Sequence, residues 1–523
     1  MINITLAIIS GLLLAFSFPT MFSGWMAPSL GPLGWVALVP LFVAIADARP
    51  RRAFLIAFVT GLVCYGISIY WIYHAVHVFG KMGVVTSVIV TLLLVLLVST
   101  YLALGPMIAR YIKTRWRGEM IVLLPVVWTA LEFARTYFPF GGFPWANIAM
   151  SQWQALIPLQ ILDVLGMYGL IFVMIWVNWI IAELVMIFRG ETRAFIGAKV
   201  VATVLIISVV IGYGLHRMDA VEDVMADSEV VSVGIVQGNI PQDEKWQATK
   251  ARYNLDVHRK ATKELFESGV DLIVWPEASF TQYVSDQVSS ADPRSFGLPM
   301  QTLGPLPAVM FGVIVYGKNN NAYNSALLFD AKGELLGRYD KSHLVPFGEY
   351  VPMKDYLFFA KKLTTPIGNF QFGKRFEPMK FSKGKLATLI CYEDAFPDIS
   401  RKMVRKGADI LVNLTNDAWY GWSSAAYQHL ALGVLRSVET RRFTIRSTNT
   451  GISAFISPTG DVVMKSPMFE RLVMVGAVNP MTMLSPYVKY GDWFAWGCVV
   501  YSLIGLIVSF VLVITRKKKV AKG

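Results

Sequence analysis

The chain has 523 residues, of which 55% are hydrophobic and only 16% are charged, and its mean hydropathy is +0.50. Soluble globular proteins carry about 25% charged residues, so this composition argues against a soluble multidomain enzyme, and its apolar content excludes a disordered or fibrous chain. The net charge is +13 and there are three cysteines, which indicates a polytopic membrane protein without a disulfide framework.

Eight long apolar runs predict membrane-spanning helices, seven before residue 217 and one after residue 490. Each run has roughly the 20 residues that a bilayer helix needs. The predicted spans are 3–19, 30–47, 54–77, 83–110, 120–138, 160–188, 196–215 and 492–515. The first run has neither a positive leading region nor a small-residue cleavage site, so we expect a retained helix and not a signal peptide.

Lysine and arginine are concentrated in every second connection between the predicted spans. These basic residues are Arg49, Arg51, Arg52, Arg110, Lys113, Arg115, Arg117, Arg189, Arg193, Lys199, Arg516, Lys517, Lys518, Lys519 and Lys522. The alternate connections 20–29, 78–82 and 139–159 hold a single basic residue, Lys81. Because positive loops face the cytoplasm, we expect both termini inside the cell and the segment 217–490 on the outer side.

The segment 217–490 has the pattern of a layered α/β domain. Predicted strands are 230–237, 271–276, 308–316, 322–330, 386–392, 409–414, 450–457 and 471–478, and predicted helices are 246–267, 396–406 and 424–442. Short buried strands that alternate with amphipathic helices are typical of this class. We therefore expect a membrane domain at 1–216, an outer domain at 217–490, and the eighth span with a basic tail at 491–523.

The sequence contains no pattern typical of a metal, cofactor or nucleic-acid site. The six histidines are scattered without ligand spacing, and neither a P-loop nor a G-x-G-x-x-G motif is present. The positive charge lies at the membrane face, which argues against nucleic acid as a partner. We expect no metal, no cofactor and no nucleic acid.

Three predicted strand ends in the outer domain carry polar side chains that core packing does not need. Glu277 follows a strand that ends in Trp-Pro, Lys341 and Glu349 lie in one loop rich in Pro and Gly, and Cys391 ends a third strand. Taken singly, Glu277 could form a salt bridge, Lys341 could be solvated, and Cys391 could be a buried inert thiol. The hypothesis of an active site rests on their combination, because sites in open α/β sheets form outside the strand ends.

The order of these motifs resembles a known family. Trp-Pro-Glu at 275–277, Tyr-Asp-Lys through Gly-Glu-Tyr at 339–350, and Cys-Tyr-Glu at 391–393 resemble the Glu-Lys-Cys triad of the nitrilase superfamily. With eight predicted spans around that domain, the whole chain resembles the bacterial apolipoprotein N-acyltransferases. The segments 142–145 (Gly-Phe-Pro-Trp) and 416–421 (Asn-Asp-Ala-Trp-Tyr-Gly) fit the same family. The resemblance implies an αββα-layered nitrilase-like domain in the periplasm, held on the bacterial inner membrane.

The resemblance also implies a reaction and a role for each triad residue. Glu277 would be the general base, Cys391 the nucleophile that forms a thioester, and Lys341 the cation that stabilises the oxyanion. The implied donor is a phospholipid. The implied acceptor is the N-terminal amine of a diacylglyceryl-cysteine apolipoprotein, so that the reaction would be the final step of lipoprotein maturation.

Six further site residues are expected by the same resemblance. The accessory and oxyanion residues are Glu349, Tyr392 and Glu393, and the substrate-binding residues are Trp246, Trp419 and Tyr420. We expect a monomer, because the sequence shows no interface signature.

Two other functions compete with this interpretation. A membrane-tethered amidase or nitrilase that hydrolyses a small amide could use the same triad, with water in place of the amine. The eight predicted spans and the 142–145 loop favour a lipid substrate instead. A transporter would need ionisable residues along its helices, and the predicted spans two, four, seven and eight carry almost none.

Overall fold

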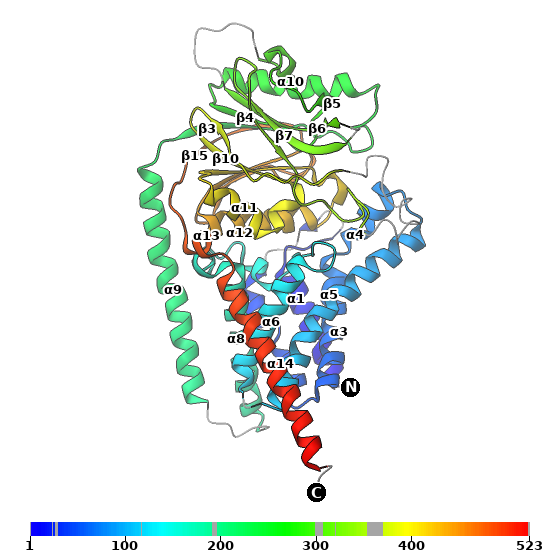
Figure 1. Cartoon of the computed structure of the whole chain (residues 1–523), viewed down its shortest axis with the longest axis vertical. Helices are drawn as coiled ribbons and strands as arrows, with labels where there is room; N and C mark the ends of the chain where they lie inside the picture. The colour runs from blue at the N-terminus through cyan, green and yellow to red at the C-terminus, as the bar shows by residue number, and fades with distance from the viewer. Residues whose placement is uncertain are drawn as a thin grey trace.

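The computed structural model describes residues 2–22, 25–26, 30–116, 118–190, 196–298, 307–318, 321–352 and 370–520. The molecule has a helical half, which holds both termini, and a layered α/β half at the opposite end (Figure 1). Helices α9 and α14 connect the two halves, one on the way into the α/β half and the other on the way out.

The helical half consists of long apolar helices joined by short turns. Its helices are α1 (Ile2–Ser17), α2 (Val39–Ile45), α3 (Pro50–Ser68), α4 (Trp71–His74), α5 (Val84–Lys113), α6 (Met120–Tyr137), α7 (Leu156–Leu159), α8 (Leu162–Phe188), α9 (Gly197–Ala226), α13 (Pro486–Tyr490) and α14 (Trp493–Val520). Three short turns are η1 (Gly31–Trp35), η3 (Ile148–Gln152) and η2 (Ala75–Phe79), the last a π-helix. A two-stranded ribbon pairs β1 (Met21–Phe22) with β2 (Trp25–Met26).

Six of the described helices, α3, α5, α6, α8, α9 and α14, are long and apolar enough to cross a membrane. The chain is therefore a multi-pass membrane protein, as its composition predicted. The other two predicted spans correspond to shorter apolar helices, α1 and the segment 31–45. The predicted helix at 30–47 is divided into η1 and α2, and each piece has a proline at one of its first two positions. Proline starts a helix more readily than it continues one, because it lacks the N–H.

Small residues let the helices of this half approach closely. A Cβ added to Gly11 on α1 would lie 2.7 Å from Val63 on α3, and a Cβ added to Gly61 on α3 would lie 2.8 Å from Ser99 on α5. Glycine at such crossings is typical of membrane helix packing, where close backbone contact replaces the hydrophobic effect as the driving force.

The α/β half contains two sheets that pack face to face. The seven-stranded sheet has the order β15-β3-β4-β6-β7-β8, with β5 paired to β6, and the six-stranded sheet has the order β14-β13-β12-β11-β10-β9. The first sheet comprises β3 (Val231–Gln237), β4 (Leu272–Val274), β5 (Phe280–Ser285), β6 (Ala308–Tyr316), β7 (Ala322–Phe329), β8 (Leu335–Asp340) and β15 (Leu472–Val478). The second comprises β9 (Met379–Phe381), β10 (Gly384–Ile390), β11 (Ile410–Thr415), β12 (Phe443–Thr448), β13 (Ala454–Ile456) and β14 (Val462–Lys465).

Helices cover both outer faces of this sandwich. Helix α10 (Ala251–Glu267) lies on the seven-stranded sheet, and α11 (Pro397–Arg405) and α12 (Ala425–Thr440) lie between the other sheet and the membrane helices (Figure 1). The layers are thus α, β, β, α, in agreement with the predicted fold class. Strands β3, β4 and β6 run parallel, as do β10, β11 and β12, so each group delivers its carboxyl ends to one edge.

Some element boundaries differ from the predicted ones. Helix α9 continues past residue 217, the predicted start of the outer domain, to Ala226. The helix predicted from 246 begins only at Ala251, because the residues before it form consecutive turns. Strands β5, β8, β9, β12 and β14 were not predicted.

One buried side chain on α12 joins the two halves. The Gln428 amide oxygen accepts hydrogen bonds from the indole N–H groups of Trp71 at 3.2 Å and Trp145 at 2.7 Å. Its amide nitrogen donates to the carbonyl oxygens of Pro19 at 3.1 Å and Ser68 at 3.0 Å. Helix α12 therefore has a fixed position on the membrane helices, and the same helix lies behind Cys391.

Candidate active site

Cys391 lies at a sharp turn at the end of β10. It has a φ of +53° and begins the 3-10 turn η7 (Cys391–Ala395). A non-glycine residue in this region of φ costs about 1–3 kcal/mol, so its surroundings must hold it. Asn413 and His429 do so, because their side-chain nitrogens each donate to the Cys391 carbonyl oxygen at 3.2 Å. The thiol side chain is buried.

Two carboxylates and a lysine lie near the thiol: Glu277 and Lys341 follow strand ends of the other sheet, and Glu349 lies in the loop after Lys341. Glu277 follows β4, and its Oε1 accepts a hydrogen bond from Asn324 Nδ2 of β7 at 2.8 Å. Lys341 follows β8, and its Nζ lies 2.9 Å from Glu349 Oε1 and 3.7 Å from Glu277 Oε1. Asn324 also donates to Glu349 at 3.0 Å, so the amide fixes both carboxylates around the ammonium.

Burial and neighbouring charge set the protonation states of the thiol and the lysine. Burial, followed by the Glu277 carboxylate, raises the pKa of Cys391 above its usual value, and Lys341 only partly offsets this. Burial disfavours the Lys341 cation, but Glu349 and Glu277 raise the pKa of Lys341 above its usual value. The resting site therefore holds a neutral thiol and a charged ammonium, and the thiol needs a base before it can act as a nucleophile.

Glu393 joins the loop after β8 to the end of β10. Its Oε1 accepts from the Tyr339 hydroxyl at 2.8 Å and from the backbone N–H groups of Ser342 at 2.7 Å and His343 at 3.0 Å. Its Oε2 accepts from the backbone N–H of Ile390 at 2.8 Å. Since Lys341 and Cys391 are the chain neighbours of these backbone groups, Glu393 fixes the position of the ammonium relative to the thiol.

Tyr392 connects the thiol loop to the membrane half. Its hydroxyl donates to the Gly142 carbonyl oxygen at 3.3 Å, and its ring lies 6.1 Å from the Trp145 ring in a stacked arrangement. The 142–145 loop that the sequence singled out therefore packs directly against the residue after Cys391.

A buried cluster of ions lies behind the Cys391 backbone. The His429 ring is held between Asp417 at 2.8 Å and Asp394 at 2.9 Å, and Arg446 contacts the same two carboxylates at 3.1 and 2.9 Å. Burial and Arg446 oppose a charged imidazole, but the two aspartates raise the pKa of His429 to about 9. Burial opposes ionisation of Asp417, but His429 and Arg446 hold the pKa of Asp417 below its usual value. His429 and Asp417 therefore form a buried ion pair at neutral pH.

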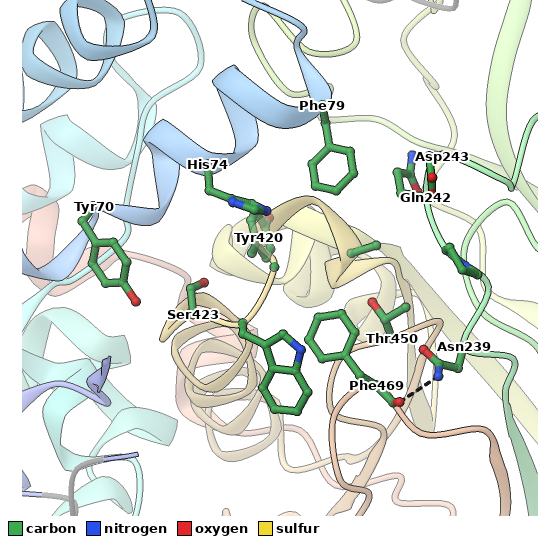
Figure 2. Close-up of a pocket in the computed structure, with 14 residues that line it drawn as sticks. Tyr70, His74, Phe79, Asn239, Gln242, Asp243, Tyr420, Ser423, Thr450 and Phe469 are labelled. Carbon is green, nitrogen blue, oxygen red and sulfur yellow. Dashed lines mark hydrogen bonds between the residues drawn. The ribbon is translucent and has the colours of Figure 1, made fainter. Parts of the chain in front are cut away.

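A cavity of about 510 Å³ lies between the membrane helices and the α/β half, and Tyr420, which is within electrostatic reach of Cys391 and Glu277, lines it. Figure 2 shows Tyr70, His74 and Phe79 on the membrane-helix side and polar side chains of the α/β loops on the other. The lining residues are Tyr70, His74, Phe79, Asn239, Pro241, Gln242, Asp243, Ala418, Tyr420, Gly421, Trp422, Ser423, Thr450 and Phe469. Its size and its combination of apolar and polar walls are typical of a ligand site.

The three predicted substrate-binding residues lie in different places. Tyr420 lines the cavity, and burial, followed by the nearby Cys391 and other charges, raises its pKa far above the usual value. The Trp419 ring lies 5.5 Å from the Phe79 ring, behind the cavity wall. Trp246 packs on a separate apolar cluster that includes Leu344, which is in the loop between Lys341 and Glu349.

Sequence reasoning missed several buried residues of this site, among them Lys245, Asn324 and His429. Asn324 is a polar residue within a strand, and its side chain reaches Glu277 only because β6, which follows Glu277's strand in the sheet order, pairs with β7. His429 shows no ligand spacing because its partners come from separate segments. An asparagine inside a largely apolar strand was an available signal, and it marks Asn324 in β7 and Asn413 in β11.

Comparison with known proteins agrees with this geometry. Residues 10–180 match the apolipoprotein N-acyltransferase N-terminal domain, and residues 232–484 match the carbon-nitrogen hydrolase domain. The apolipoprotein N-acyltransferase of Geobacter metallireducens is 36% identical over 512 residues, which cover 97% of this chain and 95% of that protein. This chain belongs to the apolipoprotein N-acyltransferase family. The family member of Methylococcus capsulatus is 32% identical, over 94% of this chain and 93% of its own.

The C-terminal half of this apolipoprotein N-acyltransferase family member is thus a carbon-nitrogen hydrolase domain, and the chain is an enzyme of the acyltransferase class. The predicted family and enzyme class are confirmed. Among solved structures, Saccharomyces cerevisiae Nit3, a member of branch 10 of the nitrilase superfamily, aligns with 48% of this chain and 91% of its own. That alignment has a TM-score of 0.35 and 17% identity.

Proposed function

We propose that this enzyme moves an acyl chain from a phospholipid, through a thioester on Cys391, to the N-terminal amine of a diacylglyceryl-cysteine apolipoprotein. This is the final step of lipoprotein maturation. The observation that carries the proposal is that Cys391 lies within electrostatic reach of Glu277, Lys341 and Tyr420, and that Tyr420 lines a cavity between the α/β half and the membrane helices.

In the first half-reaction, Glu277 takes the proton from the Cys391 thiol, and the sulfur attacks the ester carbonyl of the phospholipid. Lys341 and the backbone N–H of Tyr392 stabilise the oxyanion that forms. The carbon–oxygen bond then breaks, Glu277 returns the proton to the glycerol oxygen, and a lysophospholipid leaves. The thioester remains on Cys391.

In the second half-reaction, the amine of the acceptor attacks the thioester carbonyl. Glu277 takes a proton from the amine, the carbon–sulfur bond breaks, and the sulfur regains a proton as the amide leaves. Glu349 keeps the Lys341 ammonium in place in both steps, since its Oε1 lies 2.9 Å from Nζ.

A lipid that binds in the cavity reaches the Cys391 thiol while part of the lipid stays in the membrane. Transfer of an acyl chain from lipid into water costs about 0.8 kcal/mol per CH₂, so a site away from the bilayer would be very costly for two-chain substrates. Phe79 and Tyr70 of the membrane half offer an apolar wall, and Tyr420, which is within electrostatic reach of Cys391, lines the same cavity. We assign Trp419 and Trp246 to the surroundings of the substrate.

The orientation proposed from the sequence fits the same mechanism. We propose eight spans, formed by the six long helices together with α1 and the segment 31–45, with both termini in the cytoplasm and the α/β half in the periplasm of the bacterial inner membrane. The alternation of basic loops and the location of both termini in the helical half support this orientation. We retain the division at 217 and 491 as a functional one, and a monomer as the active form.

Mass spectrometry tests the thioester. Purified protein incubated with phospholipid should gain one acyl mass on the peptide that carries Cys391, and hydroxylamine should remove it. Cys391→Ala should gain none, whereas Cys64→Ala, which removes a buried thiol of the membrane half, should behave as wild type. The absence of any hydroxylamine-labile adduct on Cys391 across phospholipid head groups would contradict the proposed function.

A further inference from the structure

A second buried lysine lies in the candidate site. Lys245 is in the turns after β3, its side chain is 3% exposed, and its Nζ donates to the backbone carbonyl oxygen of Glu277 at 2.9 Å. Within the described residues this is its only side-chain hydrogen bond, and it forms no salt bridge with a described carboxylate. An ammonium has three donors, so this one is buried with unused hydrogen-bonding capacity.

The surrounding chain holds Lys245 in this position. Its backbone N–H donates to the Pro241 carbonyl oxygen at 3.0 Å, and its carbonyl oxygen accepts from Asn254 Nδ2 of α10 at 3.2 Å. Burying an ammonium costs several kcal/mol unless nearby charge compensates for it. A position so fixed and so costly indicates a role beyond packing.

Titratable groups from four elements converge near this ammonium. Glu277 at the end of β4 and Cys391 at the end of β10 both act on Lys245, and His258 of α10 lies within its electrostatic reach. Lys341 approaches the Glu277 carboxylate from the end of β8. The two glutamates, Glu277 and Glu349, therefore balance the two lysines, and the balance is kept when Glu277 takes the thiol proton and the Cys391 thiolate replaces its negative charge.

We propose that Lys245 is a positioning residue of this site, whose ammonium fixes the backbone of Glu277 and supplies the positive charge that balances the Cys391 thiolate. The proposal rests on the proposed function only for the role of Glu277 as the base that takes the thiol proton. Without Lys245 the group would carry a net negative charge even before the thiolate forms, and like charge opposes ionisation.

The protonation behaviour of Lys245 agrees with this role. Burial lowers the pKa of Lys245 to about 8, although Glu277 and Cys391 act in the opposite direction. At neutral pH the ammonium form is therefore the major form, and the balancing charge is present where the enzyme works.

Alkylation of Cys391 by iodoacetamide tests the proposal, because it depends on thiolate formation and requires no lipid. Glu277 takes the thiol proton, the sulfur–carbon bond forms, and iodide leaves. Lys245→Gln keeps a donor for the Glu277 carbonyl but removes the charge. We expect the acid limb of its pH–rate profile to move to higher pH by about one unit, and the rate at pH 7 to fall roughly tenfold. Lys245→Arg keeps the charge and should restore the wild-type limb.

The rates are measured on the full-length protein in detergent, from the mass of the peptide that carries Cys391. Lys250→Gln is the matched control, because Lys250 lies at the end of the same loop with its side chain 44% exposed, and its profile should match the wild type. A wild-type profile for Lys245→Gln overturns the proposal. If Lys245→Gln shows no cooperative unfolding, the variant is not folded and Lys245→Arg tests the proposal instead. An acid limb of Lys245→Arg that is displaced from the wild-type position also overturns the proposal.

The alkylation experiment and the acyl-transfer experiment fail in different ways. A missing lipid-derived adduct contradicts the proposed function and leaves the alkylation profiles of Lys245→Gln and Lys250→Gln as expected. Unchanged alkylation profiles with a normal lipid adduct contradict only the role of Lys245.

Discussion

The buried side chain of His429 supports the backbone of Cys391. Its ring lies between Asp394 and Asp417, and its Nε2 also reaches the Cys391 carbonyl oxygen at 3.2 Å. A charged imidazole can donate from both nitrogens, whereas a neutral one can donate from only one. The geometry of the thiol turn is thus coupled to the charge of a completely buried histidine.

This charge predicts a pH-dependent stability. The folded-state pKa of His429, about 9, is above the usual value of 6.5, so its contribution is fully present below pH 6.5 and is lost as the pH rises through 9. The full contribution is about 3 kcal/mol, from 1.36 kcal/mol per unit. We expect the apparent melting temperature in detergent to fall between pH 7 and pH 9.5, and the fall to be much smaller in His429→Gln. Equal slopes in the two proteins would mean that the imidazole is neutral in the folded state.

A site residue could be predicted from the sequence only where the residues next to it in the chain form a recognisable pattern. Glu277 and Cys391 each lie at the end of a strand that the sequence predicted, and Lys341 lies in a loop marked by Pro and Gly, so all three could be selected from sequence. Lys245 could not, because nothing in a turn-rich segment indicates that a lysine folds inward toward Glu277. Its environment is created by strand neighbours that only the sheet order reveals.

At the scale of elements, β6 determines where the Trp-Pro-Glu turn can lie. Gly312 of β6 donates to the Pro276 carbonyl oxygen at 3.2 Å. A Cβ at this position would lie 2.4 Å from the Ala278 nitrogen and 2.7 Å from the Glu277 Cα, closer than real Cβ contacts. The strand therefore needs glycine here so that the turn after β4 can pass over it.

Gly312→Ala should displace Glu277 from Asn324 and Lys341. Misplacement of a reacting group by about 1 Å costs on the order of 10²-fold in rate, and overpacking costs about 1–3 kcal/mol in stability. We expect acylation of Cys391 by phospholipid to slow by this order while the protein stays folded, as measured by adduct formation and thermal unfolding.

Gly433→Ala on α12 serves as the comparison, since its added Cβ would meet its nearest atom at 3.6 Å, an ordinary contact. It should acylate at the wild-type rate. If Gly312→Ala acylates as fast as Gly433→Ala, the close packing of β6 against the turn has no part in placing the base.

The elements that sequence predicted well are those with a single dominant pattern. Strand β6 was predicted at its observed bounds, because nine apolar or small residues run between turns. By contrast, β12 was missed because it begins directly after α12, with Arg441 and Arg442 between them and no glycine or proline to mark the change. The buried Arg446 interrupts the apolar pattern of β12. Its burial is explained by its ion pairs with Asp394 and Asp417, which lie far from it in the sequence.

At the scale of the whole molecule, the two halves share one buried amide. Gln428 is completely buried and makes four hydrogen bonds across the boundary, two to indoles and two to carbonyl oxygens. The next residue in α12 is His429, behind the thiol. The membrane helices and the candidate site are therefore joined by consecutive side chains.

Gln428→Leu should weaken this junction. Each buried group left without a partner costs about 1–3 kcal/mol, so we expect a loss of about 3 kcal/mol or more. The measurement is thermal unfolding in detergent, followed by tryptophan emission, in which Trp71 and Trp145 lose a hydrogen-bond acceptor. Gln287→Leu, at an exposed position, should unfold like the wild type. Identical unfolding of the two variants would show that the junction contributes nothing to stability.

The pairing of β3 with β15 has a consequence for how the protein is made. The register joins Gln237 to Leu472, so the first strand of the α/β half gains this neighbour only after about 235 further residues have been synthesised. At about 5–20 residues per second, that interval is roughly 10–50 s. During that time the nascent chain displays an apolar strand edge, which is prone to aggregation. The seven-stranded sheet gains its last strand shortly before α14 is synthesised, so ribosome pausing or slow export near residue 470 should affect the yield of folded enzyme more than a delay elsewhere.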